Sequence, residues 1–388
     1  MSYSVIWNNE KGEQPEWRTW PLAGITDSYR LKHKFSPVLT VDVTGGTIEP
    51  VDSKYGVFVY SGANSAIVSS AMQLSGTVLS GGVMTMHVYN KGSALDTTVP
   101  TATMRIFQGG YASGVVFSKT TFTVRSGGLA DDVVISDTGS AYISGAVTSL
   151  TQNDGTVFVE GGTVSGYTHN SYHEDLFIRS GGLVVDLTHT KNCGTTLSGG
   201  SLLSNAHISA GSLKVSSGCT ATVVEATSCN VYVYDGGLLS SCELLNTGRL
   251  TVLSGGSASG ITALSAGSAT IASGGIAIDV TQSGGYLYVS DGGVVSHAVG
   301  GPRILDGGYV VDLTVTSKNT ARVFAGGSLA TATVDNGGIL QVSGGVASDV
   351  ILLSGGTLMV SSGASALDVT SVDGARVDSK AGAYITYK

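Results

Sequence analysis

The sequence predicts an all-β protein whose chain winds into a parallel β-solenoid, a coil of stacked circuits that are called rungs below. Two observations predict this fold. Glycine, with 56 of the 388 residues, recurs at a nearly fixed spacing along most of the chain, and apolar and polar residues alternate between the glycines as they do in half-buried strands. A third observation argues against helices, because no segment shows the 3.6-residue periodicity of a helix.

The glycine spacing gives the length of one rung. Eighteen glycines close similar segments, and thirteen of the seventeen intervals between them are 18 or 19 residues long. A fixed period of this length indicates a stacked repeat fold. About 17–18 rungs of 18–19 residues are therefore predicted, as a repeat array over residues 46–388. The glycines are Gly62, Gly81, Gly109, Gly127, Gly145, Gly161, Gly181, Gly199, Gly218, Gly236, Gly255, Gly274, Gly292, Gly307, Gly326, Gly344, Gly363 and Gly382.

Each interval contains two or three short strands. Leu287–Val289 precedes a glycine and alternates apolar with polar residues, and Ala277–Val280 follows one in the same way. A single rung cannot bury its apolar face, whereas stacked rungs bury a continuous core of Val, Leu and Ile. A β-propeller is excluded, because it needs repeats of about 40 residues with four strands each.

Residues 1–45 lie outside the repeat and are predicted to form an N-terminal cap. They hold all three tryptophans of the chain, Trp7, Trp17 and Trp20. The end of a solenoid exposes strand edges that invite aggregation, so a cap is physically expected. The tryptophans are interpreted as the core of this cap, with a ligand-stacking platform as the alternative.

Composition excludes several classes of protein. Six prolines are too few for collagen, and 42% hydrophobic residues are too many for a disordered chain. No apolar run is long enough for a membrane-spanning helix. A net charge of −8 argues against a protein that grips nucleic-acid phosphates. The N-terminus shows no basic region followed by an apolar run, so no signal peptide is visible.

The four cysteines are predicted to be small, partly buried thiols. The C-x-x-C spacing of a metal site is absent, and disulfides would require an oxidising compartment that the sequence does not establish. The redox state of these residues is left open. They are Cys193, Cys219, Cys229 and Cys242.

Six aspartates share one position of the repeat, five residues after the glycine. Two of them, Asp349 and Asp368, belong to neighbouring rungs and could pair as the carboxylates of a glycan-cleaving enzyme. We instead expect each aspartate to mark a strand corner, because a structural device recurs whereas a catalytic pair occurs once. No nucleophile elbow and no P-loop is present, so no catalytic residue, cofactor or metal is predicted. The ladder is Asp132, Asp186, Asp279, Asp312, Asp349 and Asp368.

Two long intervals are predicted to bulge from the solenoid as contact loops. The interval from Gly81 to Gly109 has about nine extra residues, with Tyr89, Asn90 and Lys91 as candidate contacts. The interval from Gly161 to Gly181 holds a dense polar cluster. Loops that leave a rigid scaffold commonly carry function. The candidate contacts in this second loop are His169, His173 and Glu174.

The histidines are not expected to bind a metal. His169 and His173 form an H-x-x-x-H pair, which needs a helix face to bring both rings to one zinc ion. The other four histidines of the repeat array occupy different positions of the repeat and are expected at the surface. They are His87, His189, His207 and His297.

Segments such as SGGIAIDVTQSGGYLYVSDGG (273–293) and SGGVASDVILLSGGTLMVSSGASALDVTSVDGARV (343–377) resemble the AIDA-type repeats of autotransporter adhesin passengers. The resemblance covers about residues 55–388. It implies a right-handed β-helix at the surface of a Gram-negative cell, active in adhesion, autoaggregation or biofilm formation. It also implies heptose on serines of the repeat, added by a heptosyltransferase. The extended signal peptide and C-terminal membrane strands of that family are not visible in this sequence.

The sequence therefore predicts a non-enzymatic surface adhesin or self-association passenger. Its expected partners are cell-surface glycans or proteins, other copies of the chain and a heptosyltransferase, and not nucleic acid. A phage or injection-system fibre that recognises host polysaccharide is the first alternative, and a glycan-cleaving β-helix enzyme is the second. Serines that precede a glycine pair are the glycosylation candidates by resemblance, although serine also suits turns. They are Ser126, Ser180, Ser198, Ser254, Ser273, Ser283, Ser343 and Ser354.

Overall fold

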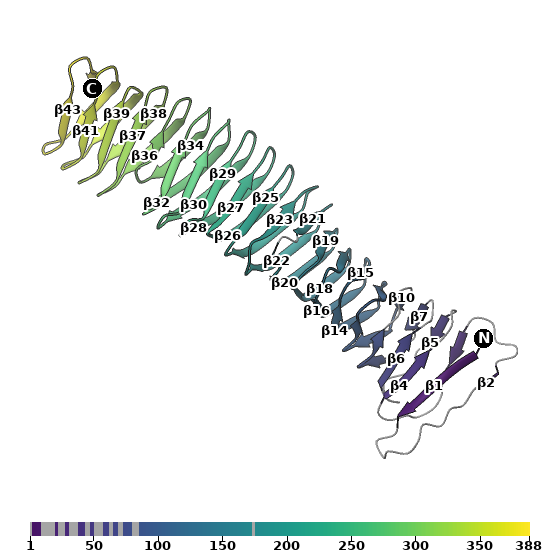
Figure 1. The fold of residues 1–388 in the computed structure, drawn as a ribbon. Coiled ribbons are helices and arrows are strands. Elements are labelled where there is room, and N and C mark those ends of the chain that lie inside the picture. The colour runs from purple at the N-terminus through teal and green to yellow at the C-terminus, as the bar shows by residue number, and fades with distance from the viewer. Residues whose placement is uncertain are drawn as a thin grey trace. The chain divides into compact units, whose positions relative to one another are not determined.

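The structure, a computed structural model, is built from β-strands (Figure 1). It describes residues 73–79, 85–172 and 175–388 together with Val68, and only the strand backbone of residues 2–8, 20–21, 28–30, 38–42, 47–49, 57–61 and 65–67. Contacts divide the chain into two compact units, residues 1–193 and 194–388. Among the described residues, no helix is long and apolar enough to cross a membrane.

In the first unit, longer and shorter strands alternate along most of the chain. The strands are β1 (Ser2–Asn8), β2 (Trp20–Pro21), β3 (Ser28–Arg30), β4 (Val38–Asp42), β5 (Thr47–Glu49), β6 (Val57–Ser61), β7 (Ser65–Val68), β8 (Gln73–Ser75), β9 (Val78–Leu79), β10 (Thr85–Val88), β11 (Ser93–Leu95), β12 (Thr98–Val99), β13 (Thr103–Ile106), β14 (Tyr111–Phe117), β15 (Thr121–Val124), β16 (Leu129–Ile135), β17 (Ser140–Ile143), β18 (Ala146–Gln152), β19 (Thr156–Glu160), β20 (Thr163–His169), β21 (Asp175–Arg179) and β22 (Leu183–His189). Strand β23 (Cys193–Leu197) begins at the last residue of this unit.

The second unit repeats the same alternation. Its strands are β24 (Leu202–Ile208), β25 (Gly211–Val215), β26 (Thr220–Thr227), β27 (Cys229–Val233), β28 (Leu238–Leu245), β29 (Arg249–Val252), β30 (Ser257–Leu264), β31 (Ser268–Ile271), β32 (Ile276–Ser283), β33 (Tyr286–Val289), β34 (Val294–Val299), β35 (Arg303–Ile304), β36 (Tyr309–Val315), β37 (Thr320–Phe324), β38 (Ser328–Val334), β39 (Ile339–Ser343), β40 (Val346–Leu352), β41 (Thr357–Val360), β42 (Ser365–Ser371), β43 (Arg376–Ser379) and β44 (Tyr384–Tyr387).

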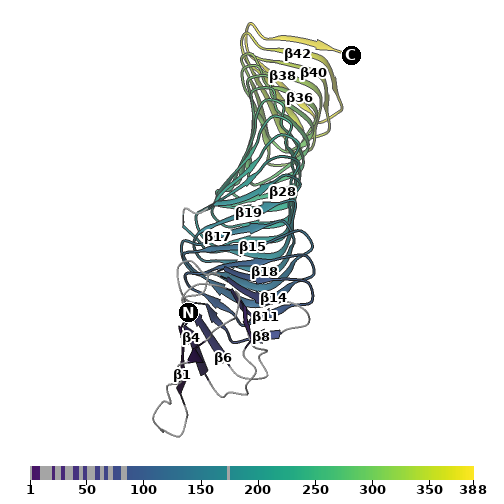
Figure 2. The same ribbon diagram turned by 90° about the vertical axis from the view of Figure 1, so that its right-hand side faces the viewer.

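One rung consists of a long strand followed by a short one, and within each unit most strands pair in parallel with their counterparts in the neighbouring rungs. In the first unit β16 pairs with β14 and β18, and in the second β38 pairs with β36 and β40. Figure 2 shows these strands lying in successive layers within each unit. The predicted β-solenoid is therefore confirmed, with about 17 rungs, and the arrangement is consistent with a right-handed β-helix.

The long strand bends at its fourth residue, which gives each rung a third corner. In β16 the buried residues are Ala130, Val133 and Ile135. In a straight strand the first two of these would face opposite sides, because side chains alternate with a period of two. Asp132 between them has φ 47°, and this left-handed residue turns the chain so that both segments point their apolar side chains into the core.

The predicted corner position of the aspartate ladder is confirmed, although each strand continues through the bend and does not end at the aspartate. All six aspartates occupy the bend of a long strand, with φ between 47° and 59°. Asp, Asn and Gly enter the left-handed region more readily than other residues, which explains why they recur there. The bend residues from β14 onward are Gly114, Asp132, Ser149, Gly166, Asp186, Asn205, Val223, Ser241, Gly260, Asp279, His297, Asp312, Thr331, Asp349 and Asp368.

Val223 is the least suitable residue at a bend, and replacing it is expected to stabilise the protein. It is β-branched, has φ 52° and is 54% exposed, so it bears backbone strain without filling the core. Val223→Asn should raise the free energy of unfolding by about 1 kcal/mol, measured by urea denaturation. Val346→Asn is the control, because Val346 is also exposed but lies outside the bend positions. An equal gain in both variants would contradict the strain explanation.

The predicted loop between Gly81 and Gly109 is wrong. Thr85 pairs with Thr103 and Ser93 with Tyr111, so this part of the chain follows the solenoid with an ordinary 18-residue offset. Lys91 has φ 63° and donates its backbone N–H to the carbonyl of Gly109, and thus stands where other rungs have glycine. Because a lysine and not a glycine occupies this corner, the glycine spacing predicts one long interval where the structure has a regular corner. Gly81 itself lies outside the described residues.

The first strands differ from the rest in their pairing. β1 pairs antiparallel with β2 and β4, whereas β3 pairs in parallel with β5 and β4 with β6. The predicted cap core of Trp7, Trp17 and Trp20 lies outside the residues whose side chains are described. The cap over residues 1–45 stays a prediction.

Candidate functional site

A shallow groove opens on the second unit where one rung is too short. The offset between β34 and β36 is 15 residues, since Val294 pairs with Tyr309, whereas Tyr309 pairs with Ser328 at the usual 19. The shortening falls on the corner around Gly301 and on β35, which has only two residues. The corners of the neighbouring rungs, which have ordinary lengths, therefore project beyond this one.

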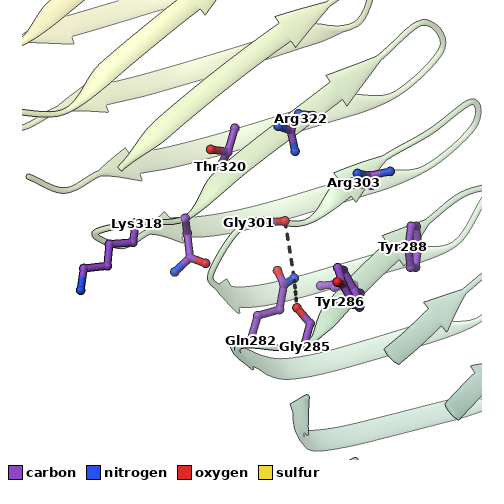
Figure 3. A pocket seen from close by; sticks show the side chains of 11 residues that line it. Gln282, Gly285, Tyr286, Tyr288, Gly301, Arg303, Lys318, Thr320 and Arg322 are labelled. Atoms are coloured by element: carbon purple, nitrogen blue, oxygen red, sulfur yellow. Dashed lines mark hydrogen bonds between the residues drawn. The ribbon is translucent and has the colours of Figure 1, made fainter. Parts of the chain in front are cut away.

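The groove has a volume of about 250 Å³ and is lined by three successive rungs. Figure 3 shows Gln282, Gly285 and Tyr286 on the rung before the short corner and Lys318 and Thr320 on the rung after it. The side-chain amide of Gln282 donates hydrogen bonds to the carbonyls of Gly285 (3.4 Å) and Gly301 (3.5 Å). These bonds tie the recessed corner to the rung before it.

The groove is positively charged although the chain carries a net charge of −8. Arg303 and Arg322 are register partners on adjacent parallel strands, so their backbones lie about 4.8 Å apart. Lys318 is a third cation in the lining. Among the described residues, none of these three side chains forms an ion pair with a carboxylate. Like charges directly opposite in a sheet are destabilising, so this pair works against the stability of the fold.

Aromatic side chains complete the groove. Tyr286 and Tyr288 stack with ring centroids 6.3 Å apart, and Tyr286 is 50% exposed. The guanidinium of Arg303 lies 5.9 Å from the ring centroid of Tyr288. Guanidinium groups bind carboxylate, sulfate or phosphate through paired N–H donors, and exposed tyrosine rings offer an apolar face and a hydroxyl. The groove can therefore hold an anionic group next to a ring or sugar face.

The serines proposed as glycosylation acceptors lie mainly on the surface. Six of the eight are exposed, whereas Ser198 and Ser343 are half-buried. Ser180 and Ser273 have φ 51° and 53°, which places them at corners next to a glycine. The exposed serines are Ser126, Ser180, Ser254, Ser273, Ser283 and Ser354.

The candidate contact residues separate into different environments. Tyr89, Asn90 and Lys91 are exposed, and the Tyr89 ring stacks on Phe107 with centroids 4.6 Å apart. His169 is fully buried as the last residue of β20, so the expectation of a contact residue in a loop is wrong for this histidine. Its side chain points inward because the bend at Gly166 turns this part of the strand toward the core. His173 and Glu174 lie outside the described residues.

The remaining histidines are only partly where the sequence places them. His207 and His297 are exposed, as predicted, and His297 lies between Asp279 (3.8 Å) and Asp312 (3.4 Å) in the ladder of bends. His87 is half-buried, and this burial together with Arg105 lowers its pKa. His189 is 1% exposed, so the prediction of a surface residue is wrong there.

The four cysteines are free thiols, which settles the redox state that the sequence leaves open, and they are fully rather than partly buried. Burial raises the pKa of Cys193 and Cys229 to about 12 and also raises the pKa of Cys242. These three thiols are therefore neutral at physiological pH and fill the core as small apolar side chains.

Sequence reasoning missed the groove residues Arg303, Arg322 and Lys318. The 15-residue interval from Gly292 to Gly307 was the available signal, because a shortened rung must recess one corner. A long interval in the sequence predicts a protruding loop. A short interval produces a hollow, and its position becomes clear only from the pairing of the strands.

No protein-family model matches the chain, and no curated protein matches it significantly. Among solved structures, it is similar to a fragment, residues 55–350, of TibA hyperglycosylated by TibC, with 23% sequence identity and a TM-score of 0.34. The match covers 84% of this chain and 97% of that fragment. Values this low do not place the chain in a family.

Proposed function

We propose that the chain is a non-enzymatic surface adhesin and self-association passenger, and that its groove binds an acidic glycan. The observation that carries the proposal is the pair Arg303 and Arg322, two cations in register on adjacent strands with no acidic partner among the described residues. A bound anion would remove the repulsion between them. Glycans that carry carboxylate, sulfate or phosphate supply such an anion together with a sugar ring.

Other atoms of the groove suit a sugar. The Oε1 atom of Gln282 is buried and has no hydrogen-bond partner among the described residues, so a ligand hydroxyl could donate to it. The exposed ring of Tyr286 lies beside it and offers a stacking surface. The groove is shallow and open, so the affinity of one site would be modest. An adhesin compensates through many simultaneous contacts, which add avidity without a deep pocket.

Self-association is supported by an exposed apolar row on the second unit. The first residue of the long strand faces outward, and it is apolar in alternate rungs: Leu238, Ile276, Tyr309 and Val346 are 40–50% exposed. The rungs between carry mainly small hydroxyl residues, such as Ser257 and Ser328, at this position. A second copy has the same spacing along its own row, so two rows can align in register over many rungs.

Glycosylation is part of the proposal. The six exposed candidate serines lie at corners or at strand ends next to corners, where an enzyme can reach the hydroxyl without opening the sheet. Display outside the cell accounts best for a chain that has both a glycan-binding groove and exposed apolar rows. We propose these six serines as the acceptors and a heptosyltransferase as the enzyme that modifies them.

The test measures polysaccharide binding by a variant that lacks the two arginines. The purified chain is applied to immobilised polygalacturonate and heparin, with dextran as the neutral reference. We expect binding to the acidic polymers that weakens with salt, and at least about tenfold weaker binding by Arg303→Gln/Arg322→Gln, since each charged hydrogen bond contributes about 1.5–3 kcal/mol. Lys214→Gln/Arg249→Gln is the control, because both cations are exposed on the same unit outside the groove.

Two outcomes would contradict the proposal. Equal binding by the groove variant and the control variant would mean that general surface charge holds the polymer. Binding to dextran as strong as to the acidic polymers would mean that the arginines do not select for negatively charged glycans.

A further inference from the structure

Three consecutive rungs of the first unit carry polar side chains inside the core. Gln152, His169 and His189 are register partners at the last position of β18, β20 and β22, and each is at most 1% exposed. In the two rungs before them the same inward position holds Phe117 and Ile135. Burying polar groups costs free energy that an apolar residue at this position would avoid. The run of three therefore sets this part of the column apart from the rungs before it and places two imidazoles side by side in the core.

The two histidines meet a cysteine. β20 and β22 lie side by side (Figure 1), and the rings of His169 and His189 are perpendicular with centroids 5.1 Å apart. Cys193 follows four residues after His189 and is 3% exposed. One ligand atom from each of the three side chains, a ring nitrogen or the thiol sulfur, lies within 4.8 Å of the other two.

We propose that His169, His189 and Cys193 form a binding site for a zinc ion. Zinc takes imidazole nitrogen and thiolate sulfur as ligands at about 2.0–2.3 Å, so ligand atoms around one ion are about 3.3–3.6 Å apart. The three ligand atoms lie within 4.8 Å of one another in the structure, and binding of the ion would draw them to this spacing. On binding, the Cys193 S–H bond is replaced by an S–Zn bond, and the proton passes to solvent.

The donor set favours zinc over other common ions. Calcium and magnesium take oxygen ligands, which none of the three side chains provides. Two imidazoles and one thiolate are typical of zinc, with copper as the main competitor. Three protein ligands leave a fourth position for a water molecule.

The hydrogen-bonding neighbours make the site a built feature of the core. The hydroxyl of Tyr167 donates to Oε1 of Gln152, and its ring is tilted against His169 with centroids 5.9 Å apart. Tyr167 is 1% exposed, so this contact fixes one side of His169 from inside the solenoid. The ion would join β20 to β22 and to the start of β23, and would hold the corner after β22 to the core.

The experiment loads the purified chain with cobalt(II), which replaces zinc and reports a thiolate ligand by its sulfur-to-metal charge-transfer absorption. The chain is stripped with a chelator and then loaded both as the folded protein and during refolding from denaturant, since the site is buried. We expect one cobalt ion per chain with a charge-transfer band, displacement of cobalt by zinc, and a higher midpoint of thermal unfolding with zinc than with chelator.

Matched variants separate this site from other thiols and histidines. Cys193→Ser should lose the charge-transfer band, and His189→Gln should bind cobalt at least about tenfold more weakly. Cys229→Ser is the control, because Cys229 also starts a short strand and points into the core. His207→Gln controls for an exposed histidine. Circular dichroism confirms that each variant keeps its β-structure.

The proposal is overturned if wild-type chain refolded with cobalt shows no charge-transfer band. It is equally overturned if Cys193→Ser keeps the band while Cys229→Ser loses it. A folded Cys193→Ser variant that zinc stabilises as much as wild type would show that the ion binds elsewhere.

Discussion

Raising the pH from 9 to 11 is expected to destabilise the second unit by at least about 2 kcal/mol through two buried cysteines. Cys229 has its pKa raised from 9.0 to about 12 by burial, and burial also raises the pKa of Cys242. Above pH 9 the unfolded chain releases both protons while the folded chain keeps them. The stabilisation is therefore complete below pH 9 and is lost as the pH rises, by about 1.4 kcal/mol per pH unit for each thiol.

The measurement is urea denaturation at pH 8, 9, 10 and 11 for wild type and for Cys229→Ala/Cys242→Ala. The variant should start lower, because the core loses two sulfur atoms. Its stability should then fall less steeply with pH, so that the difference between the two proteins shrinks or reverses by pH 11. Parallel curves for the two proteins would show that the thiols do not contribute to alkaline unfolding.

Gly155→Ala is expected to be among the most destabilising single-methyl substitutions in the first unit. Gly155 has φ 78°, and a Cβ atom there would lie 2.0 Å from the backbone oxygen of Gly139 in the preceding rung. The variant meets two costs: the left-handed conformation, about 1–2 kcal/mol, and the displacement of one rung against the next. The total should exceed about 3 kcal/mol, because neither backbone segment can rotate away from the contact.

Gly181→Ala separates the two costs. Gly181 has the same φ of 78°, and a Cβ atom there would meet nothing within 4 Å. This variant should lose only the conformational part, about 1–2 kcal/mol. Thermal unfolding of both variants tests the difference. Equal losses would mean that the corners of neighbouring rungs do not press on each other.

The fold was predictable because its main determinants are local and repeated. Regular glycine spacing and alternation over segments such as Leu287–Val289 indicate stacked strands without knowledge of any contact. The recurrence of aspartate at one position also indicated corners correctly. The glycine spacing and the alternation recur in most rungs, so a rung that departs from them does not hide the pattern.

The candidate sites were less predictable, because they depend on which way single side chains point. Lys91 occupies a glycine corner, and a lysine carries no signal for a left-handed residue. His169 faces the core because the bend at Gly166 reverses the parity of the alternation, so counting residues from the preceding glycine assigns it to the wrong side. The pairing of Arg303 with Arg322 depends on a 19-residue offset that follows a 15-residue one, which is visible only once the strands are aligned.

The short rung around Gly301 shows how such a protein can change. Three or four residues are missing there, yet Tyr309 and the strands after it resume the usual offset at once. A deletion at a corner therefore changes only the rung in which it occurs, and the core positions of the neighbouring rungs stay aligned. The same architecture can acquire a new hollow, or lose one, by a small change in a single repeat. The strand positions that form the core are therefore independent of the corner residues, and selection for a new ligand can change the corners without changing the core.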